Sequence, residues 1–142
     1  MTDVDRTTQA AWTALMTKSR QLLETVEAAL KSAGHPPLSW YDALLELEKV
    51  GEEGIRPFEL RQRLLLPQYG TSRLLDRMVT AGLVNRRDCE EDGRGQIVFI
   101  SERGLAIRKA MWPEYSKVLT DGIGDKLTRA EAVQLAMLLS KL

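Results

Sequence analysis

The stretch GTSRLLDRMVTAGLVNRR, residues 70–87, decides the fold. Its apolar residues recur at helical spacing, and they are Leu74, Leu75, Met78 and Val79. Residues 68–81 are therefore predicted to form a helix with one apolar face. Gly82 ends this helix, because glycine is the usual residue just past a helix C-terminus. Residues 83–87 then predict a short strand, so a helix passes directly into a strand.

The flanking segments complete the motif. Downstream, residues 96–100 predict a second strand, and Asp92-Gly93 between the two strands favours a tight turn. Upstream, Pro57 suits the first position of a short helix. Two short helices followed at once by a hairpin define a winged helix-turn-helix. The fold class is therefore mainly α (α+β), with the wing at about residues 83–100.

Four more helices are expected outside this motif. A long helix over residues 8–33 ends at Gly34, and a second helix begins at Ser39 with Asp42 in a relaxed capping box and ends at Gly51. Ser101 is expected to cap a helix that begins near Gly104.

The last two helices carry further signals. Pro113 should kink the first of them, and Gly122 and Gly124 should close it. Thr128 and Glu131 open the last helix with a capping box, and this helix is apolar nearly all round, so it must be buried on most sides. One domain, residues 1–142, is expected: a reading head at about 39–103, and dimerisation helices at about 8–34 and 104–142.

Composition excludes several classes of protein. The chain of 142 residues is 44% hydrophobic and 28% charged, which is ordinary for one folded domain. It has no apolar run long enough to cross a membrane and no secretion signal, so a cytoplasmic protein is expected. Cys89 is the only cysteine and His35 the only histidine, which leaves neither a disulfide framework nor a zinc site. No cofactor or metal is expected.

The net charge and the distribution of charge give opposite indications about nucleic-acid binding. The 20 basic and 20 acidic residues sum to zero, which is not the footprint of a nucleic-acid binder. From residue 51 to residue 103, however, every basic residue is an arginine, the side chain best suited to phosphates and guanine edges. Acidic residues at 88 and 90–92 dilute this positive charge.

The motif resembles a known family. Residues 70–87 resemble the recognition helix and first wing strand of the MarR (multiple antibiotic resistance) regulators, and residues 91–95 resemble that family's Asp-x-Arg wing tip. Residues 101–104 are similar to its Thr-x-x-Gly helix start, and residues 40–48 to the second helix of one branch. The resemblance implies a two-fold homodimer, held by the first and last two helices, that acts as a repressor on double-stranded DNA. It further implies relief by small phenolic or aromatic ligands or by oxidation.

The predicted DNA-binding residues come from the recognition helix and the wing. They are Gln68, Tyr69, Thr71, Ser72, Arg73, Arg77 and Arg94. Residues at the helix start meet phosphates or base edges, and an arginine on a wing can enter a minor groove. Asp92 is expected to orient the wing tip. Asp76 is expected to pair with an arginine at the wing base, and Arg77 either contacts DNA or braces the wing.

Four residues are candidates for an effector site: Trp12, His35, Trp40 and Tyr41. They lie nearest the expected junction between the reading head and the dimerisation helices, and ordinary core packing is the alternative. Cys89 is not expected to sense oxidants, because family sensors carry their cysteine in the first helix and acidic neighbours should raise a thiol pKa.

Two other classes of function are alternatives to a DNA-binding regulator. An enzyme would pair Cys89 with His35, but nothing in the sequence brings them together, so no catalysis is expected. A winged-helix module that contacts another protein and has lost DNA binding is the other alternative. The zero net charge and the acidic wing favour that alternative slightly.

Overall fold

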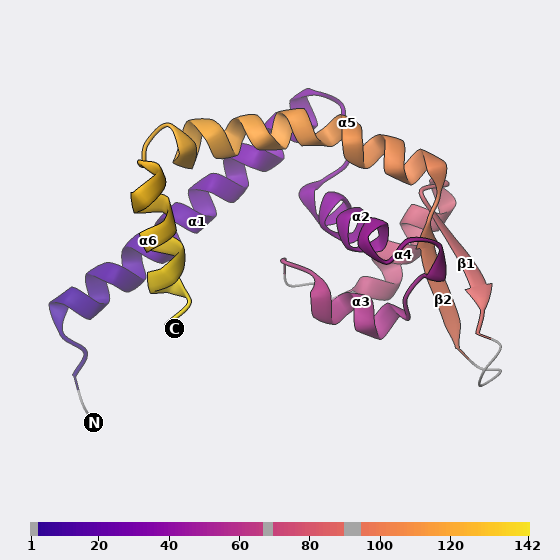
Figure 1. The fold of residues 1–142 in the computed structure, drawn as a ribbon, viewed down its shortest axis with the longest axis horizontal. Helices are drawn as coiled ribbons and strands as arrows, with labels where there is room; N and C mark the ends of the chain where they lie inside the picture. Colours follow the sequence, from indigo (N-terminus) through magenta and orange to yellow (C-terminus); the bar gives the residue numbers. More distant parts are fainter. Residues whose placement is uncertain (1–2, 67–69, 90–94) are drawn as a thin grey trace. The chain divides into compact units, whose positions relative to one another are not determined.

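A computed structural model describes residues 3–66, 70–89 and 95–142. The element order confirms a mainly helical fold with one β-hairpin (Figure 1). The elements are α1 (Arg6–Ser32), α2 (Leu38–Val50), the 3-10 turn η1 (Gly51–Glu53), α3 (Pro57–Arg63), α4 (Thr71–Thr80), β1 (Val84–Asp88), β2 (Gln96–Ile100), α5 (Glu102–Leu119), the π-helical turn η2 (Thr120–Gly124) and α6 (Arg129–Leu139).

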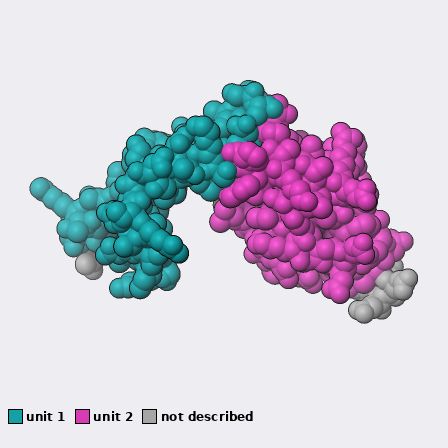
Figure 2. All heavy atoms as spheres, turned by 45° about the horizontal axis from the view of Figure 1, so that its top comes forward, with its two compact units in different colours: residues 1–33, 114–142 teal, residues 34–113 magenta. Residues whose placement is uncertain are grey.

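The chain forms two compact units, coloured separately in Figure 2. Residues 34–113 form one unit, which we call the head, and it contains the helix-turn-helix and the hairpin. Residues 1–33 and 114–142 form the other, which we call the helical unit. Within the described part of the chain, no helix is long and apolar enough to cross a membrane.

One apolar core holds the head together. Helices α2, α3 and α4 and the hairpin each contribute buried side chains to it. Its members with almost no solvent exposure are Ala43, Leu44, Leu47, Leu60, Leu75, Met78, Val84 and Val98. These are the apolar positions of each helical and strand pattern, so the predicted inward faces are confirmed where α4 and the hairpin meet.

The wing is an antiparallel hairpin. Val84 of β1 lies opposite Ile100 of β2, and the pairing runs to Asp88 opposite Gln96. The other side of β2 is bridged by Ile55, whose N–H donates to the Val98 carbonyl at 3.0 Å and whose carbonyl accepts from Val98 N–H at 2.9 Å. The residue two before α3 is thereby tied to the wing.

Residues 101–104 join the wing to α5 tightly. The Ser101 hydroxyl accepts from Gly104 N–H at 3.0 Å and donates to the Gly82 carbonyl at 2.6 Å, which confirms Ser101 as the cap. A side chain at Gly104 would collide with the carbonyl oxygen of Leu83, so only glycine permits this approach. Gly82 has φ +78°, the left-handed conformation expected of a glycine that ends α4.

The helical unit consists of α1, the last part of α5, η2 and α6. The Asp5 carboxylate caps α1 by accepting from Thr8 N–H at 2.7 Å. The predicted capping box of α6 is confirmed: the Thr128 hydroxyl accepts from Glu131 N–H at 3.1 Å, and the Glu131 carboxylate accepts from Thr128 N–H at 2.9 Å. Helix α5 continues through Pro113.

Two local predictions were wrong. Helix α2 begins at Leu38, and Pro37 stands at its N-cap, so neither Ser39 nor Asp42 caps it. The Asp42 carboxylate is instead buried and bound elsewhere in the head. Gly70 is the residue before α4, not a residue within it, and a side chain there would approach only Arg73, at 3.8 Å or more.

Candidate nucleic-acid interface

Helix α4 presents one polar face to solvent. Thr71, Leu74, Leu75 and Met78 are buried in the head, and Ser72, Arg73 and Arg77 are exposed. The exposed side chains therefore share the face that points away from the core. Because the core fixes the opposite face, these side chains are held on a rigid support. This is the geometry that reading of a DNA groove requires.

Only some of the predicted DNA-binding residues lie in the part of the chain that the structure describes. The structure brings Ser72, Arg73 and Arg77 together on α4, and it buries Thr71 at the start of the same helix. Gln68, Tyr69 and Arg94 lie outside the described residues, as does Asp92. Their predicted roles stay predictions.

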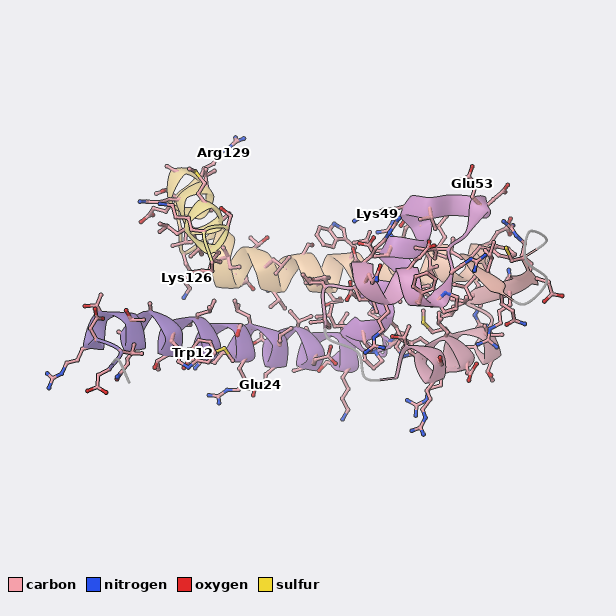
Figure 3. The ribbon with its side chains drawn as sticks, turned by 90° about the horizontal axis from the view of Figure 1, so that it is seen from below. Trp12, Glu24, Lys49, Glu53, Lys126 and Arg129 are labelled. Carbon is pink, nitrogen blue, oxygen red and sulfur yellow. The ribbon has the colours of Figure 1, made fainter. Side chains whose placement is uncertain are left out.

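Two neighbouring arginines brace the wing. Arg86 of β1 forms an ion pair with Asp76 of α4, which confirms the expected partner of Asp76. Arg87 donates to the backbone carbonyls of Glu52 at 2.8 Å and Glu53 at 2.6 Å, and its guanidinium lies 5.3 Å from the centre of the Phe99 ring. The Glu53 side chain points outward from η1 (Figure 3), so only its backbone takes part.

These contacts divide the arginine-rich segment by role. Arg86 and Arg87 are engaged within the head, whereas Arg73 and Arg77 have no recorded hydrogen bond or ion pair among the described residues. Bracing of the wing is therefore provided by Arg86 and Arg87. Sequence reasoning missed Arg87, since its partners are backbone carbonyls that carry no sequence signal.

Asp42 fixes the segment between α3 and α4. One carboxylate oxygen accepts from Leu65 N–H at 3.0 Å and the other from Leu66 N–H at 2.8 Å. The side chain is 7% exposed, so these bonds replace lost hydration of the charge. Asp42 thereby positions the chain just before the recognition helix. The only sequence signal was an acidic residue in a position that was expected to cap α2.

The effector candidates belong to different units. Trp12 projects from α1 in the helical unit (Figure 3) and is 63% exposed. His35, Trp40 and Tyr41 belong to the head, and Trp40 packs against its core. Tyr41 is buried and stacks on Trp112, with 6.2 Å between ring centres and 19° between ring planes.

An ion pair lies beside this aromatic stack. Arg108 of α5 donates to Glu48 of α2 at 3.1 Å, joining the two helices within the head. Burial disfavours the charge on Arg108, but hydrogen bonds with Glu48 and Tyr41 outweigh that effect and raise the pKa of Arg108. Tyr41 is therefore part of a packed and hydrogen-bonded junction between α2 and α5.

Cys89 is buried in the head. Its sulfur accepts from the Arg56 guanidinium at 3.5 Å, a contact between the end of β1 and the start of α3. The flanking Glu90 lies outside the described residues. This contact gives Cys89 a structural role just past the end of β1, and the expectation that it does not sense oxidants stays a prediction.

A family model described as the MarR family matches residues 36–95, which span most of the head. No curated protein sequence is a significant match to the chain. Among solved structures, AbsC, a MarR family transcriptional regulator from Streptomyces coelicolor, is 26% identical. The match covers 98% of this chain and 93% of AbsC, with a TM-score of 0.84.

Two more distant structures share the fold. Sco3205, a MarR family regulator from Streptomyces coelicolor solved in complex with DNA, is 20% identical, and the match covers 99% of this chain and 88% of Sco3205 with a TM-score of 0.89. The organohalide-sensing regulator RdhR-CbdbA1625, solved with 2,4-dichlorophenol, is 19% identical, with coverages of 97% and 80% and a TM-score of 0.81. The match over residues 36–95 and the shared winged-helix fold show that this chain is similar to MarR family transcriptional regulators.

Proposed function

We propose that this protein is a homodimeric repressor that binds a pseudo-palindromic operator in double-stranded DNA. The observation that carries the proposal is the exposed face of α4, where Ser72, Arg73 and Arg77 stand on a helix anchored by the core of the head. Helix α4 enters the major groove, and the wing lies over the flanking minor groove. Sco3205, which shares this fold, was solved in complex with DNA, and this supports DNA binding by the present chain.

Exposed apolar residues of the helical unit support the dimer. In α6, Val133, Met137 and Leu138 are each at least half exposed, and in α1 Trp12 is 63% exposed. Apolar surface of this extent is costly in a monomer and is typical of a protein interface. A second copy with the same surfaces would cover it in a closed two-fold arrangement, and it would place two α4 helices on one operator.

The proposal also includes a small aromatic or phenolic effector that binds the protein and relieves repression. The structure of RdhR-CbdbA1625 contains 2,4-dichlorophenol, and it shares the fold of this chain. Trp12, His35, Trp40 and Tyr41 remain the proposed effector residues. The Tyr41–Trp112 stack supplies aromatic surface, since Trp112 is 44% exposed.

Binding to a duplex from the protein's own promoter region tests the proposal. The affinity is expected to fall steeply with salt, because arginine–phosphate contacts release counterions. Arg73→Ala should weaken binding to promoter and unrelated DNA alike and reduce the salt slope by about one. Lys49→Ala removes an exposed charge from α2 and is the matched control, with no expected effect.

Other outcomes separate the alternatives. Absence of DNA binding at low salt by a folded wild-type protein would favour the module that contacts another protein. An Arg73→Ala variant with altered sequence preference and an unchanged salt slope would show that Arg73 reads bases. Sedimentation at micromolar concentration should give about twice 16.0 kDa, and a stable monomer would contradict the palindromic operator.

A further inference from the structure

The head contains a second basic site beside the recognition helix. We propose that the groove between α3 and the start of α4 holds one phosphate of the DNA backbone, with Arg61 as an anchoring residue that the sequence analysis did not identify. This inference rests on the proposed DNA-binding function and adds a specific contact to it. The contact sets the register of α4 on the duplex, because phosphate contacts position a protein without reading sequence.

The groove has the size and lining of an anion site. Its volume is about 440 Å³, and Arg61 of α3 and Arg73 of α4 both line it. Thr71 and Ser72 contribute the start of α4, and Phe58, which is 60% exposed, contributes an apolar wall. No carboxylate is among the described residues that line it.

The two arginines are available for a ligand. Both side chains are exposed, and neither forms a side-chain ion pair or hydrogen bond within the described ranges. They differ in this respect from Arg86 and Arg108, which are paired with Asp76 and Glu48. Two unpaired guanidinium groups at one groove favour a bound anion, and phosphate suits their planar donor geometry.

The start of α4 adds neutral donors. Its N-cap is Gly70, which has no side chain, so among the described residues the N-cap gives the first N–H groups of α4 no side-chain acceptor. Gly70, Thr71 and Ser72, which form this start of the helix, line the groove. Helix α4 is ten residues long, so its dipole also favours negative charge at this end.

Thr71 provides independent evidence for a missing ligand. The residue is only 8% exposed, and its hydroxyl has no hydrogen-bond partner among the described residues. Buried hydroxyls in folded proteins are nearly always bonded, so an unpartnered one requires an explanation. Thr71 lines the groove, and rotation about χ1 exchanges its methyl and hydroxyl groups. A phosphate in the groove would give this hydroxyl an acceptor.

Three variants of the full chain test the assignment by fluorescence anisotropy with duplex DNA at several salt concentrations. Arg61→Ala should weaken binding to promoter and unrelated duplexes equally and reduce the salt slope by about one. Arg63→Ala is the matched control, because Arg63 is an exposed arginine of the same helix that does not line the groove. It should retain more of the wild-type slope than Arg61→Ala.

Thr71→Val separates binding from folding. Valine matches threonine in shape and removes only the unpartnered hydroxyl, so the melting temperature should stay equal or rise. Affinity for both duplexes should nevertheless fall about tenfold, with little change in salt slope, because a hydrogen bond to a charged group is lost and no charge is removed. The Arg61→Ala and Thr71→Val losses should be non-additive if both side chains hold the same phosphate.

The outcomes separate this inference from the proposed function. If the wild type binds DNA with a steep salt dependence, and Arg61→Ala matches Arg63→Ala while Thr71→Val matches the wild type, the phosphate site is wrong and the DNA-binding function stands. Loss of affinity for the promoter duplex alone would also overturn it, because that result assigns these side chains to bases. If the folded wild type binds no DNA, the proposed function fails and the phosphate site with it.

Discussion

The head and the helical unit bury their apolar residues to very different extents. In the head, α2, α3, α4 and the hairpin surround a shared core whose side chains are almost fully buried. In the described part of the helical unit, the only buried apolar residues are Val26, Leu30 and Val118. Large exposed apolar residues follow the opposite distribution, and most of them lie on α1 and α6.

The difference indicates where each unit obtains its stability. Burial of apolar area is the main favourable term in folding, so we expect the head, with its shared core, to fold by itself. The helical unit should bury more apolar area against a partner chain than within itself, so its stability should depend on protein concentration. The head should behave as an ordinary two-state domain.

A charge placed on α6 should have the largest effect. Met137 is 61% exposed in the single chain and lies in the surface assigned to the partner. Met137→Glu would bury an unpaired charge in the dimer interface, which costs several kcal/mol, so the dimer should be lost. Sedimentation measures the mass, and circular dichroism should show reduced helix content with the head still folded.

Gln134→Glu is the matched control for that substitution, because it adds the same charge at a polar, exposed position of α6. It should leave more of the dimer intact than Met137→Glu. Equal dimerisation by wild type and Met137→Glu would place the dimer contact elsewhere and remove the contrast between the two units.

Truncation of a core leucine should have the next largest effect. Leu44 of α2 is 0% exposed, so Leu44→Ala should lower the free energy of unfolding of the head by about 2–5 kcal/mol. Leu65→Ala removes the same atoms from a side chain that is 75% exposed, and it should cost less than about 0.5 kcal/mol. Denaturant unfolding measures both variants. Similar values for the two would mean that the head core is not the source of stability.

Loss of the Asp42 carboxylate should have an intermediate effect on stability and should also lower the affinity for DNA. Asp42→Ala leaves the N–H groups of Leu65 and Leu66 without their acceptor, which should cost about 1–3 kcal/mol. Because these groups lie just before α4, affinity for DNA should fall even at temperatures where the variant is fully folded. Asp42→Asn keeps an acceptor oxygen and should recover part of both losses. A stability loss with unchanged DNA affinity would limit Asp42 to a structural role.

The smallest effect should come from lowering the pH, which weakens the N-terminal cap of α6. The N–H of Thr128 donates to the Glu131 carboxylate and holds the pKa of Glu131 below its usual value of 4.5. Because the pKa of Glu131 is lower in the folded protein, the cap stabilises the helix at pH values above the pKa that Glu131 has in the unfolded chain. This stabilisation is lost as the pH falls through the lower pKa of the folded protein. An NMR titration of the Glu131 carboxyl should show the lowered pKa. In Thr128→Ser, which keeps both hydrogen bonds, the pKa should stay low, whereas Thr128→Pro should return it toward 4.5 by removing the donor.

Local patterns in the sequence predicted much of the head. The apolar spacing of Leu74, Leu75 and Met78, the apolar run of β2 and the hydroxyl of Ser101 each act over a few residues, so the sequence order contains their signal. The capping box at Thr128 is local in the same way. These are the elements whose type the structure confirms.

Contacts between distant residues were not predictable. Asp42 accepts from Leu66, 24 residues away, and Arg87 donates to Glu52, 35 residues away. Neither pairing follows from periodicity, because each depends on how α2, η1 and β1 pack in three dimensions. The groove of Arg61 and Arg73 has the same origin, since its two walls come from helices that are separate in the sequence.

The pairing of the wing has a consequence for how the protein behaves at high concentration. The apolar strand β2 is hydrogen-bonded to β1 on one side and bridged to Ile55 on the other. Strand β1, which has no second neighbouring strand within the described residues, carries Arg86, Arg87 and Asp88. Charged side chains on an outer strand discourage strand addition by other molecules, and the apolar sequence QIVFI is paired with β1 along one edge and bridged at Val98 on the other. The wing can therefore extend into solvent without seeding edge-to-edge assembly.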